Sequence, residues 1–322
     1  MIEKNKLDSI SRMTKEMREI VDFEIKQSQE LSNRDFVDPY DKQGYINSRK
    51  YWNEGGPAVL RTIDEVIQGP YGQIPLRFYY PNEEEKNRCI IYIHGGGFVL
   101  GSIDSHDGII RRLANATGAT IVGIDYRLAP DYKFPVPIEE CQRLVEFLHK
   151  NGDKYNINRD NISLAGDSAG AFLSLATCLY MRDNKDDISY IKSLLLYYGS
   201  YGLGDSMSKR LYGGYWDGLT AQALDKYEEV FTDPKDRSNP YRLLFNSDLT
   251  YGIPPTYIMC GGLDPLLDDS RLLYEILKEN NITSELKIYK GLIHGFLHFS
   301  KKLAQAVSAI EDSARFYRMN TK

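Results

Sequence analysis

The sequence predicts an α/β fold with a mostly parallel central sheet, helices on both faces and a helical cap. After Pro81, short apolar runs alternate with segments of helical periodicity, the pattern of successive βαβ units. The chain has 322 residues and is 42% hydrophobic, enough for one large core. A glycine-flanked turn at residues 166–170 separates one apolar run from the next helical segment.

Each element is predicted from its local pattern. The expected strands are 89–94, 120–125, 161–166, 191–198, 255–260 and 285–289. The expected helices are 106–117, 137–150, 169–183, 268–280 and 299–318. Before them, residues 61–67 and 74–80 flank Gly69-Pro70-Tyr71-Gly72, which predicts an antiparallel hairpin or meander.

The chain divides into an N-terminal segment and a main domain. In residues 1–50 the spacing of Ile10, Met13, Met17 and Ile20 predicts one or two amphipathic helices. Residues 51–322 carry the alternating pattern, interrupted by an insertion between about 200 and 250. An insertion of this size in an α/β sheet is typical of a lid or a binding loop.

Composition excludes several classes of function. The net charge is -5 and the charges are mixed along the chain, so neither nucleic acid nor an anionic membrane surface is an expected partner. The N-terminus lacks a secretory apolar core, and no apolar run approaches the roughly 20 residues of a membrane span. We expect a soluble, cytoplasmic protein. Four scattered cysteines, which agree with a reducing compartment, are expected to be buried free thiols: Cys89, Cys141, Cys178 and Cys260.

Ser168 stands between two glycines directly after the apolar run 161–165. A helix is predicted to follow, so a serine would be expected here as its N-cap alone. Capping does not account for both Gly166 and Gly170. Glycines two before and two after a serine are typical of the nucleophile elbow, a strand-to-helix turn so tight that only glycine leaves clearance.

The stretch His94-Gly95-Gly96-Gly97 follows the predicted strand 89–94. Three successive glycines cost backbone entropy, which indicates that main-chain N–H groups must turn outward there. A phosphate-binding turn or a flexible loop is the alternative. The lysine of a phosphate-binding loop and the spacing of a dinucleotide fingerprint are both missing. A strand followed by this stretch, with a later Gly-x-Ser-x-Gly, predicts an oxyanion hole.

Two later strands end beside an acid and a histidine. Asp264 and His294 each follow a predicted strand, and the carboxyl ends of parallel strands converge at one edge of the sheet. Asp264 could instead cap the following helix, and Asp268 and Asp269 are rival acids. Both rivals lie inside the predicted helix, so Asp264 is favoured.

His298 raises the question of a metal. It lies four residues after His294, a spacing that could hold a metal ion on a helix. The glutamate of a zinc protease is missing, and no cysteine or acidic ligand is close in sequence. We therefore expect no metal site and no cofactor, and we expect His298 to pack in the interior.

Ser168, Asp264 and His294 stand in the order nucleophile, acid, histidine, the order of α/β-hydrolases, and predict a catalytic triad. From about residue 60 onward, the sequence resembles the hormone-sensitive-lipase branch of the α/β-hydrolase fold. The motifs that carry the resemblance are His94-Gly95-Gly96-Gly97, Asp125-Tyr126-Arg127-Leu128-Ala129-Pro130, Gly166-Asp167-Ser168-Ala169-Gly170, Asp264-Pro265-Leu266 and His294-Gly295-Phe296. The resemblance implies cofactor-free hydrolysis of short-chain acyl esters in the cytoplasm and a helical cap in the first fifty residues. It also implies an oxyanion hole formed by the N–H groups of Gly96, Gly97 and Ala169.

Alternatives stay open at this point. An amidase, a peptidase or a sugar deacetylase would show the same residues. A binding protein on a hydrolase scaffold is a rival from another class, but such proteins lose the catalytic histidine, and His294 is present. The expected partner is a small-molecule ester, and the chain is expected to be a monomer or a homodimer.

The insertion also bears on acyl length. Residues 198–216 are rich in aromatic side chains, which would shorten the acyl pocket if they lay over Ser168. The alternative is that they only pack the cap against the main domain. The first interpretation predicts a preference for acetyl to butyryl esters.

Overall fold

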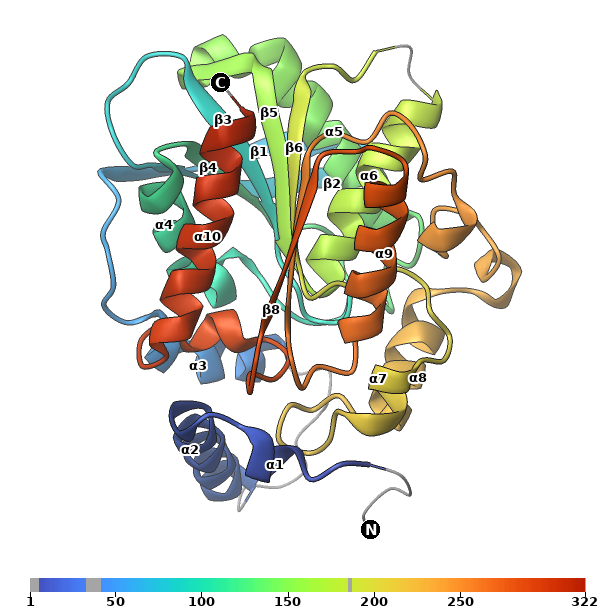
Figure 1. Cartoon of the computed structure of the whole chain (residues 1–322). Coiled ribbons are helices and arrows are strands. Elements are labelled where there is room, and N and C mark those ends of the chain that lie inside the picture. Colours follow the sequence, from blue (N-terminus) through green and yellow to red (C-terminus); the bar gives the residue numbers. More distant parts are fainter. Residues whose placement is uncertain (1–5, 33–41, 185–186, 322) are drawn as a thin grey trace.

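The computed structural model describes residues 6–32, 42–184 and 187–321 and is built around an eight-stranded sheet (Figure 1). The strand order is β1-β2-β4-β3-β5-β6-β7-β8. The pairs β1·β2 and β2·β4 are antiparallel, whereas the other neighbouring pairs are parallel. The strands are Arg61–Gly69 (β1), Gly72–Tyr80 (β2), Asn87–Ile93 (β3), Thr120–Ile124 (β4), Ile157–Asp167 (β5), Ile191–Tyr197 (β6), Thr256–Gly261 (β7) and Ser284–Tyr289 (β8). The predicted mostly parallel sheet is confirmed.

Helices cover both faces of this sheet. Figure 1 shows α4 and α10 on one face and α5, α6 and α9 on the other. The α-helices are Ser9–Arg12 (α1), Lys15–Ser32 (α2), Lys42–Asn53 (α3), Ile103–Thr117 (α4), Val136–Asn151 (α5), Ala169–Asn184 (α6), Met207–Leu211 (α7), Ala221–Phe231 (α8), Leu267–Glu279 (α9) and Ala304–Asn320 (α10). Short 3-10 helices are Gly152–Tyr155 (η1), Pro234–Asp236 (η2), Leu244–Asn246 (η3) and Phe296–Phe299 (η4).

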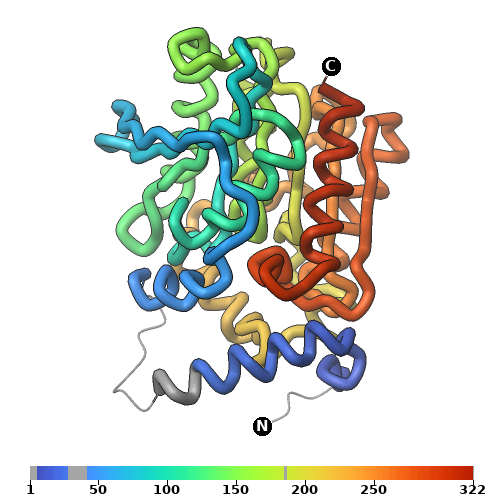
Figure 2. The backbone as a smooth tube through the Cα atoms, turned by 90° about the vertical axis from the view of Figure 1, so that its left-hand side faces the viewer, coloured from blue at the N-terminus to red at the C-terminus, as the bar shows by residue number. Residues whose placement is uncertain are grey.

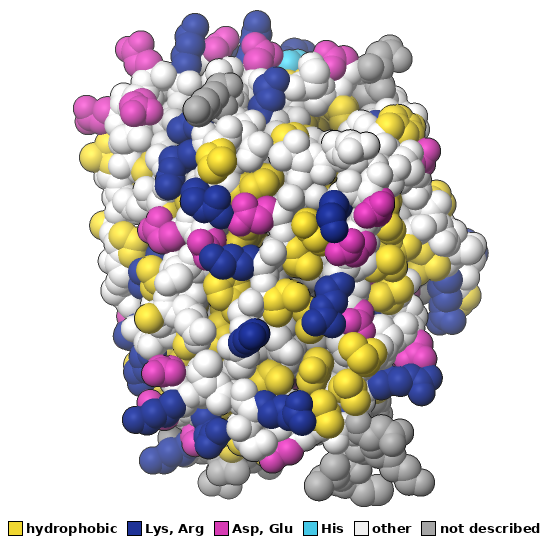
Figure 3. All heavy atoms as spheres, viewed as in Figure 1, with side chains coloured by type: hydrophobic (Ala, Val, Ile, Leu, Met, Phe, Trp, Pro, Cys, Tyr) yellow, Lys and Arg dark blue, Asp and Glu magenta, His cyan; other side chains and the backbone are white. Residues whose placement is uncertain are grey.

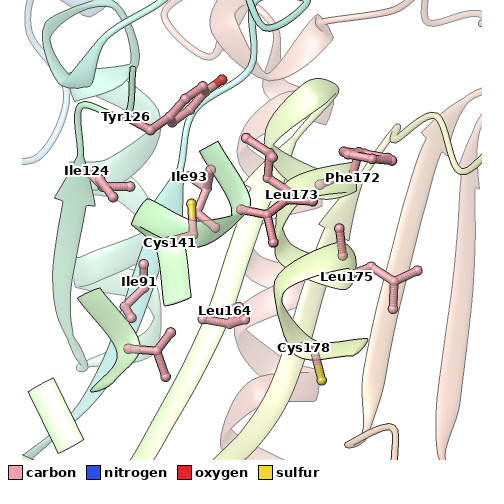
Figure 4. Packing of buried hydrophobic residues seen from close by; sticks show 14 of the residues in the cluster. Ile91, Ile93, Ile124, Tyr126, Cys141, Leu164, Phe172, Leu173, Leu175 and Cys178 are labelled. Carbon is pink, nitrogen blue, oxygen red and sulfur yellow. The ribbon is translucent and has the colours of Figure 1, made fainter. Parts of the chain in front are cut away.

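The sheet separates two layers of core. Along β3, Ile91 and Ile93 belong to one buried cluster, and Ile90 and Tyr92 belong to the other. Successive side chains of a strand point to opposite faces, so a run that is apolar at every position predicts a strand covered on both sides. Figure 4 shows part of the first cluster, where side chains of α5 and α6 meet those of β3 and β5.

The predicted elements are found with shifted ends. All six predicted strands and all five predicted helices after Pro81 are present, as is the hairpin of β1 and β2. The last helix begins at Ala304 and not at residue 299, because the chain first forms the short helix η4 and a turn. The four cysteines are buried and free, as predicted.

The N-terminal helices and the insertion between β6 and β7 lie at the same end of the molecule (Figure 1). In Figure 2 the N-terminal helices lie beside the insertion at one end of the molecule. Leu7 N–H donates to the Leu211 carbonyl at 2.9 Å, and Lys6 Nζ donates to the Lys209 carbonyl at 2.8 Å. The insertion between β6 and β7 is built from α7, α8 and two short helices.

Two surface properties bear on partners. Across the described ranges, no helix combines the length and apolar character needed to cross a membrane. On the face drawn in Figure 3, positive and negative side chains are interspersed.

Candidate active site

Ser168 occupies the turn between β5 and α6 in a strained backbone conformation. Its φ is 53°, in the left-handed region that side chains other than glycine rarely adopt. A Cβ on Gly166 would lie 2.6 Å from the Ile93 carbonyl oxygen, and one on Gly170 would overlap that same oxygen. Neither position admits a side chain, which is the physical reason for the two glycines.

Ser168, His294 and Asp264 form one hydrogen-bonded chain. Ser168 Oγ lies 2.9 Å from His294 Nε2, and His294 Nδ1 lies 2.8 Å from Asp264 Oδ2. Asp264 follows β7, His294 follows β8, and both loops open at the carboxyl edge of the sheet. Asp264 is fully buried, and its other oxygen accepts the Leu266 N–H at 2.8 Å. The three residues selected from the sequence therefore meet in space.

The charge of His294 is set by opposing effects. Burial disfavours the imidazolium, but attraction to Asp264 and its hydrogen bond outweigh burial, so the pKa of His294 is raised above the ordinary 6.5. Asp217 and Asp167 act in the same direction. The imidazole is thus poised to accept a proton from Ser168.

The two rival acids anchor the insertion. Asp269 Oδ1 accepts the backbone N–H groups of three successive residues at 2.7, 3.1 and 3.2 Å, namely Tyr201, Gly202 and Leu203. Asp268 Oδ2 accepts the N–H of Ser208 at 2.7 Å. Both acids lie in the first turn of α9, as the sequence predicted.

Gly96, Gly97 and Ala169 line the same cavity as Ser168 and His294. Both glycines have positive φ, 121° and 61°, and a Cβ on Gly96 would overlap the Leu100 carbonyl. In the part of the chain that the structure describes, the N–H groups of these three residues have no protein acceptor. They are free to bind an oxygen atom held beside Ser168.

The other two residues of the glycine stretch support the loop. Gly95 N–H donates to Asp167 Oδ1 at 3.1 Å. His94 is buried, its Nδ1 lies 2.8 Å from the Gly95 carbonyl oxygen, and its own carbonyl accepts the Tyr126 hydroxyl at 2.9 Å. Burial lowers the pKa of His94 to about 3, which keeps the ring neutral.

A buried cluster that sequence reasoning missed includes Asp167, the residue that directly precedes Ser168. One ligand atom each of His106, Asp167 and His298 lies within 4.8 Å of the others. Two imidazoles and a carboxylate are a donor set that could hold a metal such as zinc. His298 is buried, as expected. No acidic residue is close to it in the sequence, but the fold brings Asp167 close to it in space. Among these residues only Asp167 lies in a motif, so the sequence carried no signal for the cluster.

The active-site cavity has a volume of about 360 Å³ and is lined in part by residues of α3 and of the insertion. Arg49 of α3 and the insertion residues Trp216 and Asp217 line it. Arg49 Nε, Trp216 Nε1 and Asp217 Oδ2 are buried and have no hydrogen-bond partner among the residues that the structure describes. Asp217 Oδ1 closes its own loop by accepting the N–H groups of Gly214 and Leu219 at 2.9 and 3.0 Å. Helix α3 and the insertion therefore contribute polar groups to the lining of the cavity.

Comparison with known proteins defines the class. The family model described as alpha/beta hydrolase fold matches residues 90–298. The chain belongs to this family, which confirms the resemblance that the motifs indicated.

Relatives and solved structures in this family include several esterases. An acetyl esterase of Salmonella paratyphi A is 40% identical over 319 residues, covering 99% of this chain and 98% of the relative. A hyperthermophilic esterase from the archaeon Pyrobaculum calidifontis is 30% identical, with a TM-score of 0.87 over 96% of this chain and 98% of that one. A thermophilic carboxylesterase cloned from a metagenomic library is 25% identical, with a TM-score of 0.84 over 89% of this chain and 98% of the other.

Proposed function

We propose that this carboxylic ester hydrolase cleaves short-chain acyl esters, acetyl to butyryl, with a triad of Ser168, His294 and Asp264. The observation that carries the proposal is the unbroken chain from Ser168 Oγ through His294 to Asp264, with contacts of 2.9 and 2.8 Å at a cavity wall. The 40% identity to Salmonella acetyl esterases supports the acyl length. In this proposal residues 51–322 are the catalytic domain, and residues 1–50 and the insertion form its cap.

The reaction begins when His294 Nε2 takes the proton of Ser168 as Oγ bonds to the ester carbonyl carbon. The carbonyl electrons move to oxygen, and the resulting oxyanion accepts hydrogen bonds from Gly96, Gly97 and Ala169. Asp264 holds the imidazole tautomer and stabilises the imidazolium.

The first half ends when the alcohol leaves. His294 gives its proton to the alcohol oxygen as the carbon–oxygen bond breaks, which leaves the acyl group on Ser168. The second half repeats these roles with water. His294 then removes a proton from water, whose oxygen attacks the acyl carbon. The same proton passes to Ser168 Oγ as the carboxylic acid leaves.

Supporting observations extend to location and partner. The cysteines are buried and free, which supports a reducing compartment such as the cytoplasm. The partner in this proposal is a small-molecule ester, and the protein acts as a monomer or a homodimer.

The test is a panel of p-nitrophenyl esters from acetyl to decanoyl, run with the wild type and Ser168→Ala. We expect the highest kcat/KM between acetyl and butyryl and a steep fall by octanoyl. One methylene discriminates by only about 1–3 kcal/mol, so the decline should spread over several carbons. Ser168→Ala should lose activity by several orders of magnitude at every length.

Two results would contradict the proposal. Near-wild-type turnover by folded Ser168→Ala would falsify the nucleophile. A maximum at octanoyl or longer would contradict the short acyl pocket. A parallel p-nitroanilide panel addresses the amidase alternative, because faster cleavage of amides than of the matched esters would favour it.

A further inference from the structure

A second cavity lies directly beside the active-site cavity. Its volume is about 590 Å³, it is open to solvent, and it is lined by Lys6 and by residues of the insertion between β6 and β7. Four residues line both cavities, namely Ser200, Leu224, Glu228 and Arg242. These four residues therefore form the boundary, or wall, between the two spaces.

An ion pair forms part of this wall. Glu228 of α8 pairs with Arg242, whose side chain is 6% exposed. Arg242 Nε donates to Thr232 Oγ1 at 2.6 Å, and the guanidinium lies 5.3 and 5.6 Å from the ring centroids of Phe172 and Phe231. These contacts fix Arg242 in place, and Arg242 in turn holds Glu228 at the boundary between the two cavities.

The geometry at Ser168 limits how the ester can lie in the cavity. His294 must protonate the leaving alcohol, so the alcohol lies on the His294 side, while the carbonyl oxygen faces the N–H groups of the glycine loop. Helix α8 packs on that loop. A Cβ on Gly97 would lie 2.6 Å from the Tyr227 ring, and Phe98 stacks on Phe231 with 3.8 Å between ring centroids. Helix α8 therefore bounds the active-site cavity on the side of this loop.

We propose that the acyl group of the substrate extends toward α8, and that Leu224 and the Glu228–Arg242 ion pair close this end of the active-site cavity and so restrict the enzyme to short acyl chains. The proposal rests on the proposed ester hydrolysis and names the residues that set its specificity. A longer chain must displace one of these side chains. The Arg242 side chain is 6% exposed and that of Glu228 is 39% exposed, so the restriction comes from the volume of the side chains, and the ion pair serves to hold Glu228 in place. Behind the wall, the second cavity has room for the additional methylenes.

The test measures the ratio of kcat/KM for octanoyl and acetyl p-nitrophenyl esters. Glu228→Ala and Leu224→Ala each remove wall volume, and each should raise this ratio by about tenfold or more, the scale of a methylene-sized change in a pocket. Glu228→Gln keeps the volume and should leave the ratio within about twofold of wild type.

A matched control comes from the same helix. Glu229 is exposed, pairs with Lys226 and lines neither cavity, so Glu229→Ala should change neither kcat/KM value. Circular dichroism and thermal melts establish which variants fold. Having two opening variants at different positions keeps the test valid if one of them does not fold.

The outcomes are distinct for the two levels of the proposal. An unchanged ratio in a folded opening variant overturns the wall, as does an equal shift in Glu228→Gln and Glu228→Ala. A wild type that cleaves no acetyl ester, or a Ser168→Ala variant as active as wild type, overturns the ester hydrolysis itself.

Discussion

Asp167 accepts a hydrogen bond from the backbone N–H of Gly95, with 3.1 Å between Oδ1 and N. The same oxygen accepts the Tyr92 hydroxyl at 2.8 Å. Burial opposes ionisation, but His106 outweighs it and holds the pKa of Asp167 below the ordinary value. Asp167 directly precedes Ser168, so one buried carboxylate fixes the nucleophile turn relative to the glycine loop.

We expect Asp167→Ala to lower kcat for p-nitrophenyl acetate about 10- to 100-fold, because Ser168 and the loop donors lose their common anchor. The free energy of unfolding should fall by about 1–3 kcal/mol, since Tyr92 and Gly95 keep buried donors without an acceptor. Steady-state kinetics and urea unfolding measure both. Tyr92→Phe removes only one of the two bonds and should have the smaller kinetic effect. A wild-type kcat in Asp167→Ala would rule out the anchor.

The raised pKa of His294 predicts a pH dependence. The general base must be neutral, so kcat/KM should fall as pH drops through the His294 pKa, with an apparent value above 6.5. In Asp264→Asn the carboxylate that raises the pKa of His294 is gone, so burial should lower this pKa and move the acid limb to lower pH. The same change should lower kcat about 10⁴-fold. A profile of kcat/KM against pH checks both, and an acid limb that does not move in Asp264→Asn contradicts the assignment.

The same shift has a consequence for stability. Because the folded-state pKa of His294 is raised, its contribution to stability is fully present below the unfolded value, near 6.5. It is lost as pH rises through the folded value. Comparing urea unfolding of wild type and His294→Ala below and above this range detects it, and a difference independent of pH contradicts it.

Asp269 provides a contrast with Asp264. Asp269→Ala leaves three N–H groups of the insertion without their acceptor, one buried and two partly buried, so the free energy of unfolding should fall by about 1–3 kcal/mol. The kcat of Asp269→Ala should stay far above that of Asp264→Asn, because the hydrogen bonds that link Ser168, His294 and Asp264 are intact. If Asp269→Ala were as inactive as Asp264→Asn and as stable as the wild type, the assignment of Asp264 as the acid of the triad would be wrong.

The glycine loop can be tested through its steric demands. In Gly96→Ala the new Cβ meets the backbone carbonyl of Leu100 at a φ of 121°, so the loop must shift and kcat should fall about 10²- to 10³-fold, the cost of a lost oxyanion donor. Gly97→Ala meets the Tyr227 ring, a side chain that can move, and should be less damaging. Gly204→Ala is the control, since nothing lies within 4 Å of its Cβ. An active Gly96→Ala would exclude this loop from the oxyanion hole.

Chelation addresses the cluster of His106, Asp167 and His298. No step of the proposed mechanism uses a metal, so dialysis against EDTA should leave kcat unchanged. His298→Ala should retain far more activity than His294→Ala. A loss on chelation that added zinc reverses would instead assign these three residues a metal ion in catalysis.

The strands, the elbow and the triad could be predicted from the sequence because their signals are local. The run from Cys89 to Ile93 is apolar at every position, as a strand covered on both faces requires. Gly166 and Gly170 mark a turn without room for side chains. Asp264 and His294 could be chosen because parallel strands end at one edge, so a position after a strand in the sequence already implies a position in space.

Only the tertiary structure determined which side chains surround these residues. His106, Asp167 and His298 come from three distant parts of the chain, and no spacing rule connects them. The pairing of Glu228 with Arg242 depends on how the insertion folds over the glycine loop. Sequence patterns indicate the periodicity of the backbone and the positions where no side chain fits, and each segment shows these properties without the rest of the chain. Contacts between side chains of separate segments depend on packing that the whole chain must form first, so the reactive groups were determined by the sequence and their surroundings by the fold.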